Sequence, residues 1–209
     1  KIYVCYKMNI DEIDFKTGDI ILYASDKYFF DRVIQKCSKS KYVHISIVIK
    51  NPKGLKDGLY VIESAFSNPY NDEKTHTKVN GVQIHTLHDA LADNSYNYYY
   101  RKLNLTKDIP DITDKICDIE GLIHERPYDF NPIDWLEAEI RVINPNIVKK
   151  QQNSSFWCSA LVAYIYMKLG LIHRDVPWTL VNPSEFGTER ETNLPFQNCF
   201  LFPEILINL

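Results

Sequence analysis

Apolar and polar residues follow one another along this chain in blocks that predict strands first and helices later. The run Tyr42–Ile49 is almost continuously apolar and rich in β-branched residues, which is typical of a strand buried on both faces. A turn-rich loop, Asn51–Gly58, separates it from a second apolar run, Leu59–Ala65, so the two runs predict a hairpin. Late in the chain, Phe156–Leu169 places apolar side chains at helical spacing and is followed by Gly170, a residue type common at helix ends.

Weaker patterns complete the expected order of elements. Further strands are expected at Ile20–Tyr23, Gly81–Leu87 and Tyr96–Leu105. Further helical segments are expected at Lys27–Cys37, His88–Asp93 and Ile109–Glu125. The polar stretch Ser67–Asn80 is expected to form a surface loop, and Pro127–Pro145 is less regular. A series of strands followed by helices predicts an α+β fold, with an antiparallel sheet packed against helices.

Length and composition indicate one globular domain that spans residues 1–209. The chain is 45% hydrophobic and 24% charged, which is ordinary for a folded domain and excludes wholesale disorder. A formal net charge of -3 provides no basic field, so nucleic acid is not an expected partner. The longest uncharged apolar run, Phe156–Met167, is shorter than the roughly 20 residues that cross a bilayer, so no transmembrane segment is expected.

The five cysteines are far apart in the sequence and include no C-x-x-C pair. A disulfide framework and a zinc knuckle are therefore not expected, and a cytoplasmic, reducing location fits best. A metal cluster could be drawn from His85, His88, Asp72 and Glu73, but no H-E-x-x-H pattern supports a metal hydrolase. No glycine-rich phosphate loop occurs either, so a nucleotide-dependent enzyme is not expected. No cofactor is expected.

Cys158 differs from the other cysteines because it lies at the expected start of the late helix. Ser155 is a good N-cap, which places Cys158 near the third helical position. The partial positive charge of a helix N-terminus favours a thiolate over a thiol, so a nucleophile could be activated there. The alternative is a small buried side chain, since free cysteine is among the most buried residue types. For the other four cysteines the structural interpretation is favoured.

A base for this nucleophile needs to lie within hydrogen-bond reach, and a third group needs to orient the base. Of the six histidines, His44 lies inside the most apolar strand. If Asn51–Gly58 joins antiparallel strands, the centre of the loop places Ala65 opposite His44, with Glu63 two positions away on the same face. Contact between His44 and Glu63 is therefore expected, and the carboxylate would set the tautomer of the ring. The alternatives are a structural core histidine and a glutamate on a wet edge strand.

With these residues in place, the chain resembles the permuted branch of the NlpC/P60 superfamily of papain-like cysteine hydrolases, which includes YiiX-like and poxvirus-type proteins. The matching pieces, in order, are Gly18–Ile21, the His44 strand, Tyr60–Ala65, Gly81-Val82, Pro127–Asp129, Trp157–Val162 and Pro183-Ser184. In ordinary members the cysteine precedes the histidine, whereas here it follows, as in the permuted branch. Ser46 and Ala160 stand where many members carry glycine, and both are expected to add bulk near the cleft.

The resemblance implies a circularly permuted papain-like fold with the nucleophile at a helix N-terminus. It implies Cys158 as the nucleophile, His44 as the base and Glu63 as the third polar residue. Tyr128 and Trp157 would contribute to the oxyanion site or to the pocket.

The expected activity is cleavage of an amide bond, in a peptide or isopeptide, or of an ester bond through an acyl-enzyme on Cys158. One alternative is a lipid acyltransferase or thioesterase that uses the same site. A second is a catalytically inactive binding module on the same fold, because fold does not imply activity. An exposed apolar rim would favour a lipid acyl substrate, and polar anchors would favour a peptide.

Overall fold

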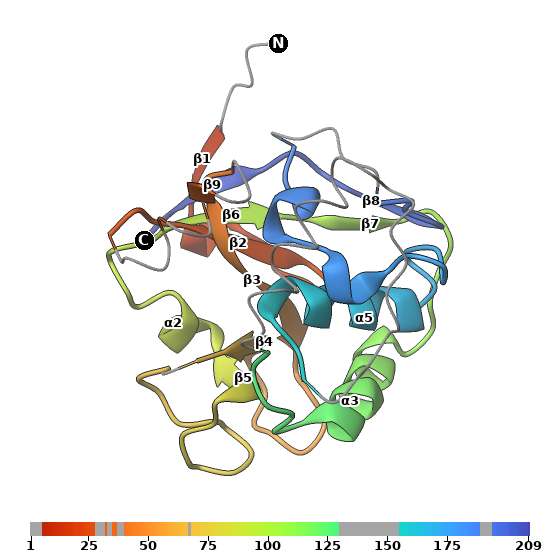
Figure 1. Cartoon of the computed structure of the whole chain (residues 1–209), viewed down its shortest axis with the longest axis horizontal. Coiled ribbons are helices and arrows are strands. Elements are labelled where there is room, and N and C mark those ends of the chain that lie inside the picture. The colour runs from red at the N-terminus through yellow and green to blue at the C-terminus, as the bar shows by residue number, and fades with distance from the viewer. Residues whose placement is uncertain are drawn as a thin grey trace.

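The computed structural model describes residues 6–27, 32, 35–36, 40–66, 68–129, 155–188 and 194–209. These residues form a seven-stranded sheet in the order β1-β9-β6-β2-β3-β4-β5, and a separate two-stranded sheet of β7 and β8 (Figure 1). The strands are β1 (Tyr6–Asn9), β2 (Ile20–Ala24), β3 (Tyr42–Lys50), β4 (Leu59–Ala65), β5 (Gly81–Thr86), β6 (Asn97–Arg101), β7 (Leu103–Leu105), β8 (Cys199–Leu201) and β9 (Ile205–Asn208). The helices are α2 (Leu87–Ala90), α3 (Ile112–Ile123) and α5 (Cys158–Lys168), with 3-10 turns η1 (Ile10–Glu12), η2 (Trp178–Leu180) and η3 (Pro183–Phe186).

The expected α+β class is confirmed, but the large sheet is mixed rather than antiparallel. β1 runs parallel to β9, whereas the other pairs of this sheet are antiparallel. Sequence patterns did not indicate β1, β8 or β9, because strands of three or four residues are too short for an alternation to stand out. The long strand expected at Tyr96–Leu105 is divided, since β6 joins the large sheet and β7 pairs with β8.

Helix α5 packs along one face of the sheet, against β3 and β4 (Figure 1). Its first nine residues are all buried, as expected for a helix that is apolar on every side. The strand residues beneath it include Ile45, Ile47 and Ile62. The opposite face of the sheet carries Ile21 and Val61, together with apolar side chains of α2.

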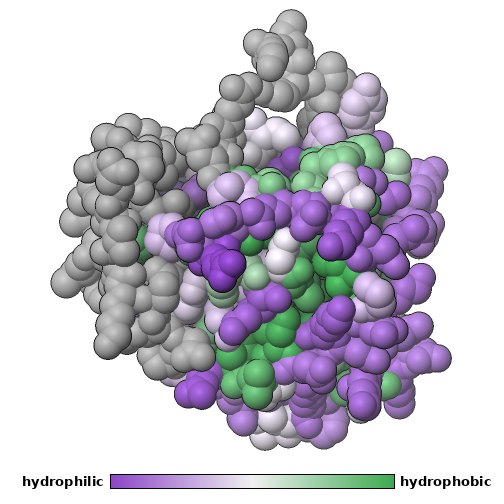
Figure 2. Space-filling model, turned by 90° about the vertical axis from the view of Figure 1, so that its right-hand side faces the viewer, coloured by the Kyte–Doolittle hydropathy of each residue, from purple (hydrophilic) through white to green (hydrophobic). Residues whose placement is uncertain are grey.

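The expected helices at Ile109–Glu125, His88–Asp93 and Phe156–Leu169 are present, and each is shorter than expected. Helix α2 also begins one residue earlier than expected, at Leu87. Of the expected helix at Lys27–Cys37, only residues 27, 32, 35 and 36 are described, and the last three of these are helical. Most of the segment Pro127–Pro145 lies outside the described residues. Among the residues that are described, no helix is both long and apolar enough to cross a membrane. Viewed from the side of α3 and β7, the surface shows a hydrophobic area bordered by hydrophilic residues (Figure 2).

Candidate active site

The β3–β4 hairpin brings His44 and Glu63 together. The two strands pair from Lys50 opposite Leu59 to Ile47 opposite Ile62. The same register extended along both strands puts Ala65 opposite His44, which is the register that the loop length predicts. Glu63 therefore lies diagonally across from His44 on the same face. The Nε2 atom of His44 is 2.7 Å from Oε2 of Glu63. The Glu63 side chain is only 4% exposed. The alternative of a solvent-exposed glutamate on an edge strand is therefore wrong.

A β-bulge shapes the backbone at His44. On the β2 side of β3, Tyr23 pairs with His44, but the next residue, Ala24, pairs with Tyr42. Val43 is therefore an extra residue in β3. A bulge bends a strand and re-aims the neighbouring side chain, and bulges are common beside active sites. The hydrophobic pattern gave no sign of this irregularity, because the run is apolar on both sides of it.

Tyr23 and Ser46 form the wall behind the His44 ring. The Tyr23 ring meets the imidazole edge-on, with centroids 4.8 Å apart. The Tyr23 hydroxyl and Oγ of Ser46 are hydrogen bonded at 3.0 Å, and both side chains are buried. Ser46, which was expected to add bulk near the cleft, takes part in a hydrogen bond of this wall.

Helix α5 begins at Cys158, with Trp157 as its extended N-cap residue. The expected N-cap was wrong: the Ser155 hydroxyl donates to Oδ2 of Asp129 at 3.2 Å, and Cys158 is the first helical residue rather than the third. Among the described residues, no side chain caps the start of α5. The backbone N–H groups of a helix's first turn point outward from its N-terminus, so they face the region around the sulfur.

The start of α5 is tied to the strand that carries Glu63. The hydroxyl of Ser64 donates to the backbone oxygen of Phe156 at 2.6 Å. Because side chains alternate along a strand, Ser64 faces α5 while Glu63 faces His44. One strand thus holds both the helix start and the carboxylate, and it brings Cys158 within hydrogen-bond reach of the His44 ring.

The electrostatics of the trio favour a charged imidazole. Burial lowers the pKa of His44, but the hydrogen bonds and negative charges of Cys158 and Glu63 outweigh it and raise that pKa from 6.5 to about 10. Burial likewise raises the pKa of Glu63, and the hydrogen bond and charge of His44 outweigh it, so the pKa of this carboxyl lies below its usual value. Since Nε2 of His44 is engaged by Glu63, Nδ1 is the ring nitrogen left for the sulfur.

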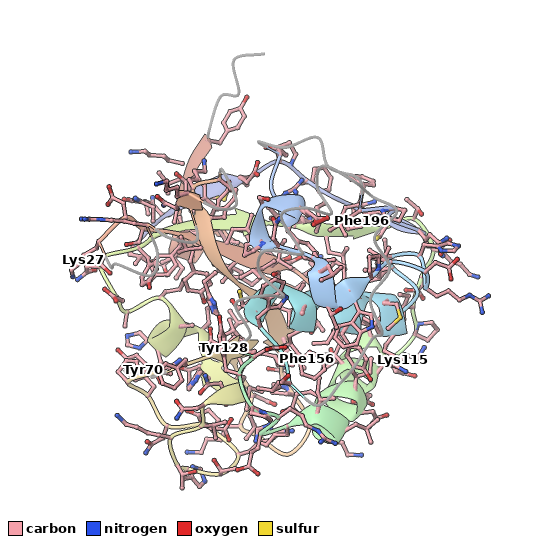
Figure 3. The ribbon with its side chains drawn as sticks, in the orientation of Figure 1. Lys27, Tyr70, Lys115, Tyr128, Phe156 and Phe196 are labelled. Carbon is pink, nitrogen blue, oxygen red and sulfur yellow. The ribbon has the colours of Figure 1, made fainter. Side chains whose placement is uncertain are left out.

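Tyr128 is placed beside Cys158 by a close crossing of backbone segments. Gly81 has a φ of +148°, and a Cβ atom there would lie 1.9 Å from the backbone oxygen of Arg126, so only glycine fits this crossing. Tyr128 then forms an isolated parallel β-bridge with Phe156, which lies just before α5. Both residues are labelled in Figure 3. Burial, with the negative charges of Cys158 and Asp129, raises the pKa of Tyr128, which keeps its hydroxyl protonated as a donor. Trp157 is buried in the core cluster beneath the site.

Asn68 is a site residue that sequence reasoning missed. The amide Nδ2 of Asn68 donates to Oε1 of Glu63 at 2.7 Å, on the oxygen that His44 does not use. Asn68 belongs to the stretch that was expected to be a plain surface loop. A polar loop residue carries no signal of the buried carboxylate that it meets, so this contact depends on the fold.

The same loop is anchored to α3 by buried charges. Asp72 is fully buried and accepts hydrogen bonds from the backbone of Lys74 and Ile84. His124 lies between Asp72 and Glu120, with Nε2 3.2 Å from Oδ1 of Asp72, and Glu120 also binds Lys74. These contacts hold the loop that carries the Glu63 partner.

The other cysteines that the structure describes, Cys117 and Cys199, lie away from this arrangement. Burial raises the pKa of Cys117, and it raises the pKa of Cys199 to about 11. Cys5 and Cys37 lie outside the described residues. Within the described ranges, no group of three or more His, Cys, Asp or Glu side chains is placed to hold a metal ion. His88, once considered with His85 as a possible ligand, has a side chain that is 91% exposed, whereas that of His85 is 1% exposed.

Comparisons with known proteins indicate the fold. No family model matches the chain, and no curated protein matches it. The chain is similar to the crystal structure of the metalloprotein yiiX from Escherichia coli O157:H7, with a TM-score of 0.50 and 16% sequence identity. The similarity covers 90% of this chain and 89% of that one. It therefore supports a yiiX-like α+β fold over most of the length.

Proposed function

We propose that the chain is a cysteine hydrolase that cleaves an amide or ester bond, with Cys158 as nucleophile, His44 as base and Glu63 as the group that orients the base. The observation that carries this proposal is the row formed by the three side chains. His44 contacts the sulfur on one side, and on the other its Nε2–H donates to the buried carboxylate of Glu63. A nucleophile, a base and an orienting group in this relation define the triad arrangement.

In the first half of the reaction, the Cys158 thiolate would attack the carbonyl carbon of the substrate. A C–S bond forms, and the π electron pair moves to the carbonyl oxygen. As this oxyanion collapses, the bond to the leaving nitrogen or oxygen breaks, and the imidazolium of His44 protonates the leaving group. The raised pKa of His44 supplies that proton at neutral pH. The products of this step are an acyl thioester on Cys158 and a free amine or alcohol.

In the second half, water would attack the thioester. His44, now neutral, accepts a proton from the water while the new C–O bond forms. The C–S bond then breaks, the acid leaves, and the thiolate and imidazolium are restored. Glu63 would keep the His44 ring in one orientation through both halves of the reaction. Its Oε2 atom stays hydrogen bonded to Nε2 of His44, so Nδ1 is directed to the reacting atoms.

The developing oxyanion would be stabilised at the start of α5. The backbone N–H groups of the first turn and the Tyr128 hydroxyl are the candidate donors. Trp157, directly before the nucleophile, would line the pocket. Such donors are effective because they are fixed before the reaction starts.

The order of the trio along the chain, with His44 and Glu63 before Cys158, supports assignment to the permuted papain-like branch. The similar crystal structure is titled a metalloprotein. The described residues of this chain offer no matching donor group, so no step is assigned to a metal. A free thiol suits a reducing compartment such as the cytoplasm, and the whole chain is proposed to act as one hydrolase domain.

The test is a comparison of native protein with Cys158→Ala on p-nitrophenyl acetate, fluorogenic peptides, a lysine-linked isopeptide and a phospholipid ester. We expect the native protein to cleave at least one of them and Cys158→Ala to lose that activity. Cys199→Ala is the matched control, because Cys199 is buried away from the trio and donates to the backbone of Leu171. Full activity in Cys158→Ala would refute the proposal. Transfer of the acyl group to an added alcohol or amine would identify a transferase.

A second measurement needs no substrate. Limited iodoacetamide treatment near pH 7 should label Cys158 faster than Cys117 or Cys199, whose pKa values are raised by burial. His44→Ala should slow the labelling of Cys158, because the imidazolium that stabilises the thiolate is lost. Equal labelling of the three thiols in folded native protein would contradict an activated nucleophile.

A further inference from the structure

His85 is a buried histidine that the proposed mechanism does not use. It lies in β5 and is fully buried. Neither of its ring nitrogens has a hydrogen-bond partner among the described residues. Buried polar side chains are almost always hydrogen bonded, because leaving such a group unpaired costs free energy. An imidazole in this state needs an explanation from its surroundings.

The pairing of β4 with β5 places His85 next to Glu63. His85 is opposite Val61 and Gln83 is opposite Glu63, so His85 and Glu63 are diagonal neighbours on one face. The Nε2 atom of His85 is 3.7 Å from Oε1 of Glu63. Gln83 does not take this place, because its amide nitrogen is directed to the backbone oxygen of Ala65 at 3.5 Å.

Oε1 of Glu63 has room for a second donor. It accepts from Asn68 at 2.7 Å, and a carboxylate oxygen can accept two hydrogen bonds. A movement of less than about 1 Å would bring Nε2 of His85 to the usual N–H···O distance of about 2.9 Å. Asn68 comes from a loop, whereas His85 comes from a strand within the sheet. His85 is thus the donor on the more rigid element.

Within the described part of the chain, one further histidine and two tyrosines interact electrostatically with this carboxylate. His44 faces Glu63 from β3, Tyr23 from β2 and Tyr98 from β6. Burial raises the pKa of Tyr23 and of Tyr98. The charge of Glu63 adds to this for Tyr23, and the charges of Asp93 and then Glu63 add to it for Tyr98, so both hydroxyls stay neutral. Helix α2, which packs over β4 and β5, adds apolar side chains such as Leu87. In this setting an imidazole N–H is well suited to balance the carboxylate.

We propose that His85 is a positioning residue for the site: its Nε2–H donates to Oε1 of Glu63 and holds the carboxylate so that Oε2 stays on His44. Glu63 is then held between two imidazoles, one that takes part in the chemistry and one that keeps the carboxylate ionised and aligned. The role in catalysis rests on the proposed function, since the alignment of His44 matters only if His44 is the base.

The test is a titration of the Glu63 carboxyl carbon by carbon-13 NMR in native protein and in position-85 variants. In His85→Leu we expect the midpoint to rise by about one pH unit, a tenfold change in the ionisation constant. His85→Gln, whose amide can still reach and donate, should return the midpoint to the native value. His85→Asn keeps an amide but is too short to reach Oε1, so its midpoint should rise as in the leucine variant.

Ile84→Val is the matched control for a general loss of stability. Ile84 is the neighbouring buried residue of β5, but it belongs to the core on the opposite face, so the Glu63 midpoint should not change in this variant. Should His85→Leu fail to fold, the comparison of the glutamine and asparagine variants still decides. The proposal would be overturned if the Glu63 midpoint were the same as in native protein in both His85→Leu and His85→Asn. If His85→Leu does not fold, an unchanged Glu63 midpoint in His85→Asn would overturn it.

The two proposals fail separately in these measurements. Native protein with no selective alkylation of Cys158 would refute the hydrolase assignment. The Glu63 titration would decide the role of His85 in either case, because it requires no substrate and no turnover.

Discussion

Replacing Glu63 by glutamine would remove one of the two negative groups that flank the His44 ring. The glutamine has nearly the same shape, so Oε1 could still accept from Asn68. Its NH₂ group, however, would face Nε2 of His44 in place of Oε2. An NH₂ group cannot accept from Nε2–H, so the charged ring loses a partner and the neutral ring would carry its proton on Nδ1.

The magnitude follows from the pKa of His44. A rise from 6.5 to about 10 corresponds to about 5 kcal/mol in favour of the imidazolium, net of the burial that opposes it. Cys158 and Glu63 both contribute through a hydrogen bond and through charge. If each supplies about half, Glu63→Gln should lower the midpoint of His44 by about two pH units, to about 8. Removing both anions should leave burial alone and take the midpoint below 6.5.

The assay is an NMR titration of the His44 ring between pH 5 and 11 in four proteins: native, Glu63→Gln, Cys158→Ala and the double variant. The His88 signal is an internal control, because this ring is on the surface and far more exposed than His44. Thermal unfolding of each variant checks that it is folded at the pH of the measurement. The imidazolium should persist to about pH 10 in native protein and be lost earlier in each variant.

A midpoint in Glu63→Gln within about 0.3 units of native would refute the reasoning. It would mean that the carboxylate does not stabilise the ring despite the 2.7 Å contact. An unchanged midpoint in Cys158→Ala would similarly show that the sulfur is not negatively charged beside His44.

Two further predictions concern the scaffold around the site. Gly81→Ala should lower the free energy of unfolding by more than about 2 kcal/mol and displace Tyr128, because the added Cβ would meet the backbone oxygen of Arg126. Gly54→Ala is the control, since Gly54 also has a positive φ but an added Cβ there would have no atom within 4 Å. Equal losses of stability in the two variants, measured by urea unfolding, would contradict this prediction. Removing the imidazole in His124→Leu should cost about 3 kcal/mol at pH 7, because buried Asp72 loses its cation. The pKa of His124 is raised to about 9, so its contribution to the free energy of unfolding is complete below about pH 6.5 and is lost as the pH rises through 9. Urea unfolding at pH 7 and at pH 10 should therefore show a smaller difference in stability between native protein and His124→Leu at pH 10. An equal difference at the two pH values would contradict this prediction.

Part of the site could be predicted because it depends on local geometry. The loop Asn51–Gly58 determines the register of the β3–β4 hairpin, and alternation then puts His44 and Glu63 on one face. The presence of a helix near Cys158 follows from the apolar spacing that ends before Gly170, but its start was predicted two residues too early, with Ser155 as the N-cap. Both features are determined by residues that are close together in the sequence.

Other features depend on segments that meet only in the folded chain. The bulge at Val43 arises from the pairing of β3 with β2, and the parallel pair of β1 and β9 joins the two ends of the described chain. Asn68 and His85 reach Glu63 from a loop and from a third strand. Sequence by itself determined the hairpin and the presence of the late helix, since local spacing defines both. The surroundings of the Glu63 carboxylate were decided by the tertiary structure alone. The residues that bury it and set the charge around it are far apart in the sequence, so no hydrophobic pattern relates them.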